Sequence, residues 1–196
     1  MGGLRALSIS RNSPKVFITG RPGIGKTTAI LKIVELCKRN GLKIGGMVTK
    51  EIRERGVRTG FQIIDLMGGR RGLLASIYAS KGPRVGKYRV ILEDLESVGV
   101  EAIEQAIAEA DVVFIDEIGP MELFSQKFQE TVVRALESPK PLIGTVHIRA
   151  RAFPFTRKIL EKYKPLVIEL SLSNRNRVPF QIYELLRKYQ LKPSSE

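Results

Sequence analysis

The sequence predicts an α/β fold of three layers, in which helices cover both faces of a mostly parallel sheet that also carries an antiparallel β insertion. Three observations lead to this prediction. Short apolar runs alternate with stretches whose apolar residues recur at helical spacing, as in strands joined by right-handed crossovers. One block, 44–92, is strand-like and lacks a helical period over most of its length. At 196 residues and 43% hydrophobic content, the chain can form one well-packed domain.

A glycine-rich turn separates the first predicted strand from the first predicted helix. The apolar run 16–18 has the length of a short buried strand. Beyond the turn, apolar residues recur at i, i+3, i+4 and i+7, which is the stripe of a helix that lies on a sheet. Gly41 suits the position beyond the end of this helix. The apolar stripe consists of Ile30, Ile33, Val34 and Cys37.

The block 44–92 is predicted to form the antiparallel insertion. Val57, Thr59, Phe61 and Ile63 alternate with polar residues or glycine, as expected of a half-buried strand. Glycine, proline and charged residues between the strand-like runs indicate turns. The predicted strands are 44–52, 57–66 and 73–78, and the predicted turns and loops are 53–56, 68–72 and 81–87.

The second half of the chain alternates between helices and strands. Its apolar runs are short, and prolines or glycines punctuate the boundaries between them. Pro179 suits the first turn of a C-terminal helix, because its missing N–H would have no partner there in any case. Helices are predicted around 102–107, 124–136, 159–163 and 179–189, and strands over 112–115, 141–147 and 164–170.

These elements predict one domain over 15–190, preceded by a loose extension over 1–14 and followed by a flexible tail over 191–196. The single cysteine excludes a disulfide framework within the chain. No apolar run approaches the length needed to span a membrane, and the N-terminus lacks a signal-peptide pattern. We therefore expect a cytoplasmic protein without a membrane partner.

The turn after the first strand carries the spacing G-x-x-x-x-G-K-[ST] of a P-loop. Its glycines allow the backbone to curl so that N–H groups point inward at a phosphate, next to the open N-terminus of the following helix. Lys26 supplies a mobile cation for the β- and γ-phosphates, and the hydroxyl of Thr27 can ligate Mg²⁺. The predicted nucleotide-binding residues of this turn are Gly20, Arg21, Pro22, Gly23, Ile24, Gly25, Lys26, Thr27 and Thr28.

Two carboxylates follow the apolar run 112–115. They are expected at the carboxyl edge of the sheet, where ligands bind in open α/β folds. In a P-loop protein, Asp116 would hold Mg²⁺ together with Thr27, because hard cations prefer oxygen ligands. Glu117 can orient a water or take its proton, which favours hydrolysis over transfer to an organic acceptor. Asp116 and Glu117 are therefore predicted to belong to the nucleotide site, with Glu117 and Lys26 as catalytic residues.

The segment 116–119 also fits the D-x-x-G motif of GTPases. That class selects guanine with an N-K-x-D loop, and no such tetrad occurs in the chain. A GTPase of that class is therefore disfavoured.

Further polar residues follow the later predicted strands. The only histidine, His147, ends the strand after the acid pair, and we predict a catalytic contact with the γ-phosphate or the attacking water; a local hydrogen bond at a strand end is the alternative. Arg149 and Arg151 could neutralise charge in the transition state, although surface arginines are the default. The segment 174–177 follows the last strand and is a candidate for contact with the base or ribose.

The charge balance is unusual, with 33 basic and 20 acidic residues and a formal net charge of +13. A positive field of this size favours polyanions and keeps nucleic acid open as a partner. The basic residues are spread along the chain, however, and no nucleic-acid-binding motif is present.

Several blocks resemble one known family over nearly the whole domain. They are 20–28, 45–51 with 58–61, 85–88, 115–123, 144–147 and 174–175, of which Asp-Glu-Ile-Gly-Pro-Met-Glu-Leu at 116–123 is far more specific than a P-loop. The chain resembles the small nucleoside-triphosphatases of archaea and bacteria that are related to the cancer-related nucleoside-triphosphatase of animals. The resemblance implies a RecA-like P-loop NTPase fold and a nucleotide site formed by 20–27 and the strand end at 112–119.

The resemblance also implies Mg²⁺-dependent hydrolysis of ATP, GTP and other nucleoside triphosphates to diphosphate and phosphate, with little base selectivity. Two alternatives use the same scaffold. One is a nucleotide or polynucleotide kinase, which needs an acceptor pocket and usually a lid. The other is a nucleic-acid-binding module switched by the nucleotide, which the positive charge motivates.

Overall fold

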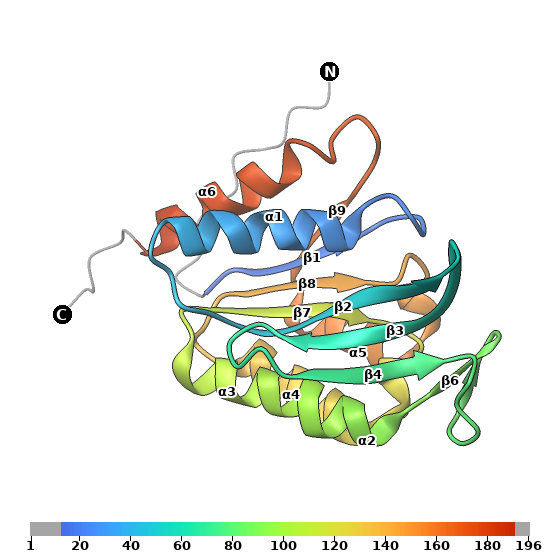
Figure 1. Ribbon diagram of the computed structural model, residues 1–196. Helices are drawn as coiled ribbons and strands as arrows, with labels where there is room; N and C mark the ends of the chain where they lie inside the picture. Colours follow the sequence, from blue (N-terminus) through green and yellow to red (C-terminus); the bar gives the residue numbers. More distant parts are fainter. Residues whose placement is uncertain (1–12, 191–196) are drawn as a thin grey trace.

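The computed structural model describes residues 13–190 of the chain (Figure 1). Most of the predicted extension over 1–14 and all of the predicted tail over 191–196 lie outside the described residues. The strands are β1 (Lys15–Thr19), β2 (Ile44–Glu54), β3 (Val57–Asp65), β4 (Arg71–Ser76), β5 (Arg84–Val85), β6 (Tyr88–Val90), β7 (Val112–Ile118), β8 (Leu142–Val146) and β9 (Leu166–Glu169). The α-helices are α1 (Lys26–Arg39), α2 (Leu92–Asp94), α3 (Glu101–Glu109), α4 (Gln126–Glu137), α5 (Pro154–Tyr163) and α6 (Val178–Gln190), with a π-helical segment over Leu95–Val100 and 3₁₀ turns over Glu122–Phe124 and Ala150–Ala152.

All nine of these strands form one sheet in the order β5-β6-β4-β3-β2-β7-β8-β1-β9. The strands β2, β7, β8, β1 and β9 are parallel to one another. Their carboxyl ends therefore meet at one edge of the sheet, which we call the carboxyl edge. The turns that follow β1, β7, β8 and β9 all leave the sheet there, so side chains distant in sequence can meet at this edge.

The remaining strands are antiparallel, as predicted for the insertion. Strand β3 pairs with β2 and β4, and β6 pairs with β4 and β5. Strand β2 belongs to both halves, since Ile44–Met47 pair in parallel with β7 while Met47–Glu54 pair with β3. The antiparallel part therefore begins with β3 and continues the main sheet without a break.

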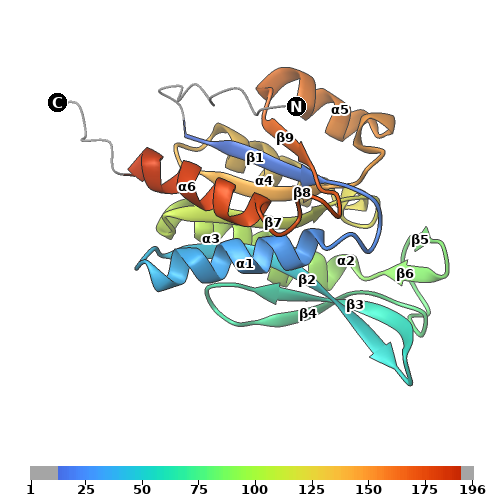
Figure 2. The ribbon, with the colours of Figure 1, turned by 90° about the horizontal axis from the view of Figure 1, so that it is seen from above.

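Helices cover both faces of the parallel half. Figures 1 and 2 show α1 and α6 on one face and α3, α4 and α5 on the other. The central strand β7 serves both layers, because Val112 and Phe114 pack into the core beneath α1 while Val113 and Ile115 pack into the opposite core. This explains why the strand reads as an unbroken apolar run rather than as an alternating one.

Three local predictions differ from the structure. Helix α4 begins at Gln126 rather than at Phe124, because the Ser125 side chain accepts a hydrogen bond from the Phe128 N–H and caps the helix. Phe124 lies on the preceding 3₁₀ turn and is 48% exposed. The predicted loop 81–87 contains strand β5 and the turn of a short β5–β6 hairpin that continues to Val90, and the helical stretch 92–100 was not predicted. Among the described residues, no helix is both long and apolar enough to cross a membrane.

Candidate functional site

The glycine-rich turn between β1 and α1 adopts the backbone conformation that its sequence predicts. Gly20, Gly23 and Gly25 all have positive φ angles. At Gly20, a Cβ would lie only 2.9 Å from the carbonyl oxygen of Leu170, so a side chain there would meet backbone. The N-terminus of α1 has no side-chain cap and no acidic residue in its first turn. The helix therefore leaves its first N–H groups for an anion.

The side chain of Lys26 contacts both the glycine-rich turn and the end of β7. Its Nζ lies 3.4 Å from Glu117 Oε2 and donates a hydrogen bond of 3.4 Å to the carbonyl oxygen of Gly20. Both side chains are mostly shielded from solvent. The structure thus brings together two residues that are far apart in sequence and that were predicted to act together.

Asp116 is 1% exposed, and its two carboxylate oxygens differ. Oδ1 accepts a hydrogen bond of 2.6 Å from the Thr145 hydroxyl, whereas Oδ2 is buried without a hydrogen-bond partner. Burial raises the pKa of Asp116, while the hydrogen bond from Thr145 and the nearby Thr27 hydroxyl act in the opposite direction. A buried carboxylate oxygen without a donor is costly unless a cation approaches it.

This oxygen and the nearby Thr27 hydroxyl fit a magnesium ion. No cluster of three or more His, Cys, Asp or Glu side chains suited to a metal occurs within residues 13–190. A magnesium ion at Asp116 and Thr27 would therefore take its other ligands from phosphate and water, as Mg²⁺ commonly does.

Glu117 and Glu122 converge on the space that the missing side chain of Gly119 leaves. A Cβ on Gly119 would lie 2.9 Å from Glu117 Oε1 and 3.2 Å from Glu122 Oε2. The Gly119 N–H also donates a hydrogen bond of 3.2 Å to Glu122 Oε2. Glu122 is 4% exposed, and burial, reinforced by the charge of Glu117, raises its pKa to about 8. The turn after β7 thus places a second carboxyl group, that of Glu122, close to the carboxylate of Glu117.

His147 directly follows β8, which lies between β1 and β7 in the sheet. Its Nδ1 accepts a hydrogen bond of 3.1 Å from the Arg149 N–H, and its ring packs edge-to-face against Phe153. This hydrogen bond is the local one that the alternative interpretation expected. The predicted contact with the γ-phosphate stays a prediction. Arg149, Arg151 and Arg21 are exposed at the same edge.

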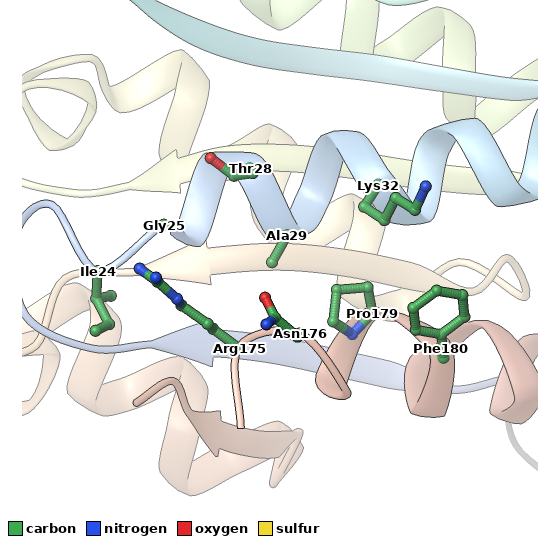
Figure 3. Close-up of a pocket in the computed structure, with 9 residues that line it drawn as sticks. All are labelled: Ile24, Gly25, Thr28, Ala29, Lys32, Arg175, Asn176, Pro179 and Phe180. Atoms are coloured by element: carbon green, nitrogen blue, oxygen red, sulfur yellow. The ribbon is translucent and has the colours of Figure 1, made fainter. Parts of the chain in front are cut away.

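A pocket of about 450 Å³ adjoins the glycine-rich turn. It lies between the first turns of α1 and the start of α6, as Figure 3 shows, with the Arg175 side chain directed toward Gly25 and with Asn176 facing α1. Its size falls in the range of small-molecule sites. The lining residues are Ile24, Gly25, Thr28, Ala29, Lys32, Arg175, Asn176, Pro179 and Phe180.

Sequence reasoning missed three parts of this site. Thr145 contacts Asp116 across two neighbouring strands, and Glu122 accepts a hydrogen bond from Gly119 within the turn after β7. The one signal for Glu122 was its place in the acidic block at 116–123. Lys32 and Phe180 line the pocket from two helices, and no sequence pattern joins them.

Three features place this chain in the class of P-loop proteins that bind nucleoside triphosphates. They are the glycine-rich turn, the contact of Lys26 with Glu117, and the buried Asp116. Comparison with known proteins narrows this class. A family model described as NTPase matches residues 15–183, and the chain belongs to this family. The predicted family, fold class and enzyme class are confirmed.

Individual relatives cover most of the chain. The nucleoside-triphosphatase THEP1 of Thermofilum pendens is 52% identical over 84% of this chain and 91% of its own length. That of Methanosarcina acetivorans is 43% identical over 86% of this chain and 94% of its own length. Among solved structures, THEP1 from Aquifex aeolicus matches with a TM-score of 0.76 at 33% identity, covering 88% of this chain and 98% of that one. A human cancer-related nucleoside triphosphatase matches with a TM-score of 0.76 at 32% identity, covering 90% and 98%.

Proposed function

We propose that this member of the NTPase family hydrolyses the β–γ phosphoanhydride bond of nucleoside triphosphates, with Mg²⁺ and with little base selectivity. The observation that carries the proposal is the ion pair between Lys26 and Glu117, next in sequence to the buried Asp116. This ion pair lies at the carboxyl edge of the sheet, beside the glycine-rich turn. A phosphate site and an acid that can activate water are the two parts that hydrolysis needs.

In this reaction the glycine-rich turn and Lys26 hold the β- and γ-phosphates. The oxygen of a water forms a bond to the γ-phosphorus, and Glu117 accepts the proton that the water loses. The bond between the γ-phosphorus and the bridging oxygen breaks, and the diphosphate leaves with that oxygen. Mg²⁺ held by Thr27 and Asp116 would neutralise phosphate charge.

The pocket beside the turn would hold the nucleoside. Its walls are the apolar faces of Ile24, Pro179 and Phe180, with Arg175 and Lys32 as cations. Such walls can contact any base. The amide of Asn176 can both donate and accept a hydrogen bond, so it does not by itself exclude a base. These features support low base selectivity.

The proposal is tested by phosphate release from ATP, GTP, CTP and UTP, each with Mg²⁺ or with EDTA. We expect release from all four at rates that differ by about tenfold or less, and loss of release in EDTA. Release from a single nucleotide would contradict low selectivity, and undiminished release in EDTA would contradict the metal requirement. A kinase would instead transfer γ-phosphate label to an added nucleoside or oligonucleotide, which a parallel reaction with γ-labelled ATP and that acceptor would detect.

A further inference from the structure

The β5–β6 hairpin carries a concentration of positive charge that the nucleotide site does not use. Between Asp65 and Glu93 the chain has no acidic residue but six basic ones. Two of these lie at the start of β4, at the opposite edge of the sheet. The other four are Arg84, Lys87 and Arg89 in the hairpin and Lys81 just before it, and we call them the hairpin cations.

The arrangement of the hairpin cations is unfavourable without a counter-charge. Arg84 and Arg89 are directly opposite each other across the two strands, and like charges in such positions destabilise a hairpin. Among the described residues, Lys81, Arg84 and Lys87 form no ion pair, and all three are exposed. An anionic partner would remove this repulsion.

The hairpin is nevertheless fixed to the sheet. Tyr88 is buried, packs edge-to-face on Phe61 and accepts a hydrogen bond of 3.0 Å from Arg58 Nε. The Val90 N–H donates to the carbonyl oxygen of Pro83 over 2.9 Å. The exposed cations are therefore presented on an anchored element.

These cations lie too far from the phosphates to serve the nucleotide. Strand β4 runs in the same direction as β2, so its end and the hairpin lie at the carboxyl edge, as Figures 1 and 2 show. In the sheet, four strand spacings separate β6 from β7, which carries Glu117, and six separate it from β1, which is about 19 Å and about 29 Å at about 4.8 Å each. A triphosphate bound after β1 does not span this distance.

An exposed aromatic side chain, Tyr78, lies two residues after Ser76, which pairs with Arg89 of the hairpin. Tyr78 follows β4, is 68% exposed, and donates a hydrogen bond of 2.8 Å from its hydroxyl to Glu54 Oε2. The hydrogen bond restrains the ring while its faces remain open. Cations that track a phosphate backbone beside an aromatic ring on which bases stack are the features of single-strand binding surfaces.

We propose that the β5–β6 hairpin and Tyr78 form a binding surface for single-stranded nucleic acid. Lys81, Arg84 and Lys87 contact successive phosphates, and a base stacks on Tyr78. The surface is separate from the nucleotide site, so binding requires no nucleoside triphosphate.

Fluorescence anisotropy of a labelled oligouridine, measured at low and higher KCl without nucleotide, tests the proposal. The matched variants are Lys81→Glu with Lys87→Glu on the hairpin, and Lys38→Glu with Lys188→Glu near the far ends of α1 and α6, all four residues being exposed. Both pairs change the net charge equally. We expect the hairpin pair to weaken binding about tenfold and to lower the salt slope by about 1.4, and the control pair to change affinity less than about threefold.

Tyr78 gives an independent readout. We expect Tyr78→Ala to weaken binding by about 5- to 150-fold and Tyr78→Phe, which keeps the stacking face, to restore most of it. Circular dichroism melts check that each variant folds, and the single variants Lys81→Glu and Lys87→Glu replace the pair if it melts early. Equal weakening by both charge pairs, unchanged affinity in Tyr78→Ala, or preferential binding to anionic lipid vesicles would overturn the proposal.

Discussion

At the scale of single residues, Glu117 has the most direct assignment. Its carboxylate lies 3.4 Å from Lys26 and is the group proposed to take the proton of the attacking water. Replacement by glutamine keeps the size of the side chain but removes the base. We expect Glu117→Gln to lower kcat by about 10²- to 10⁴-fold without weakening nucleotide binding, measured by phosphate release and by equilibrium titration.

The exposed Glu130→Gln on α4 is the control for that variant, and its rate should equal that of the wild type. Wild-type turnover in Glu117→Gln would remove the residue from the mechanism.

Gly119 offers a way to move the two carboxylates without deleting either. An added methyl group would meet Glu117 Oε1 and Glu122 Oε2, which are the far ends of flexible side chains and can shift at small cost. We expect Gly119→Ala to lower kcat by about 10- to 100-fold, because the base is displaced, while the melting temperature changes little.

Gly99→Ala is the matched control, because its Cβ would meet Met47 Sδ at 2.9 Å in the core. It should lower the melting temperature and leave kcat unchanged below that temperature. The opposite pattern in the two variants would contradict the role given to the Gly119 space.

The buried carboxyl of Glu122 predicts a pH dependence of stability. Its pKa is raised to about 8 in the folded protein from the 4.5 of an exposed glutamate. Between these values the unfolded chain loses the proton and the folded chain keeps it, so the free energy of unfolding falls as pH rises from about 4.5 to about 8. We expect a loss on the order of 4 kcal/mol that Glu122→Gln abolishes, measured by urea unfolding at pH 5 and pH 8. Equal pH dependence in both proteins would contradict it.

At the scale of elements, the start of α4 depends on one cap. The Ser125 hydroxyl accepts from the Phe128 N–H at 3.0 Å and donates to Glu96 at 2.8 Å, which joins α4 to the π-helical segment. We expect Ser125→Ala to lower the free energy of unfolding by about 1 to 2 kcal/mol. Urea unfolding measures this effect, and Ser125→Thr, which keeps a hydroxyl, should recover part of it. A loss confined to kcat would contradict a structural role.

The sequence predicted those elements whose pattern is local. The apolar stripe from Ile30 to Cys37 indicates a helix, and the apolar run 112–115 indicates a buried strand. Both elements were predicted correctly. The hairpin at 84–90 escaped prediction because its strands are too short for a period. The start of α4 was misplaced because Phe124 happened to fit the helical spacing, whereas the cap at Ser125 decides where the helix begins.

In the site, too, residues that belong to a local sequence motif could be predicted and the others could not. The P-loop and Asp116–Glu117 were predictable because each is a contiguous motif whose spacing reflects its chemistry. Thr145 was not, since its hydrogen bond to Asp116 joins two strands that are distant in sequence, and Glu122 was not, since the folded chain buries it. The pocket beside the glycine-rich turn likewise needs α6 to lie beside α1.

At the scale of the whole molecule, the order of folding should follow from the shared strand β2. A short turn joins β2 to β3, so these two strands are close in sequence. Strand β1, in contrast, pairs with β8 across most of the chain, as in the pairing of Phe17 with Gly144. Local pairings close smaller loops and form sooner. We expect pulse-labelled hydrogen exchange during refolding to show protection of β2 and β3 amides before those of β1. Simultaneous protection would contradict this order.

The β2–β3 hairpin would then act as a template for the parallel half of the sheet. Met47 pairs with both β3 and β7, so its pairing with β3 would already fix one position of the register when the acidic strand β7 docks. Lengthening the turn at 55–56 between β2 and β3 should therefore slow the assembly of the hydrolytic centre more than it reduces the final stability of the protein.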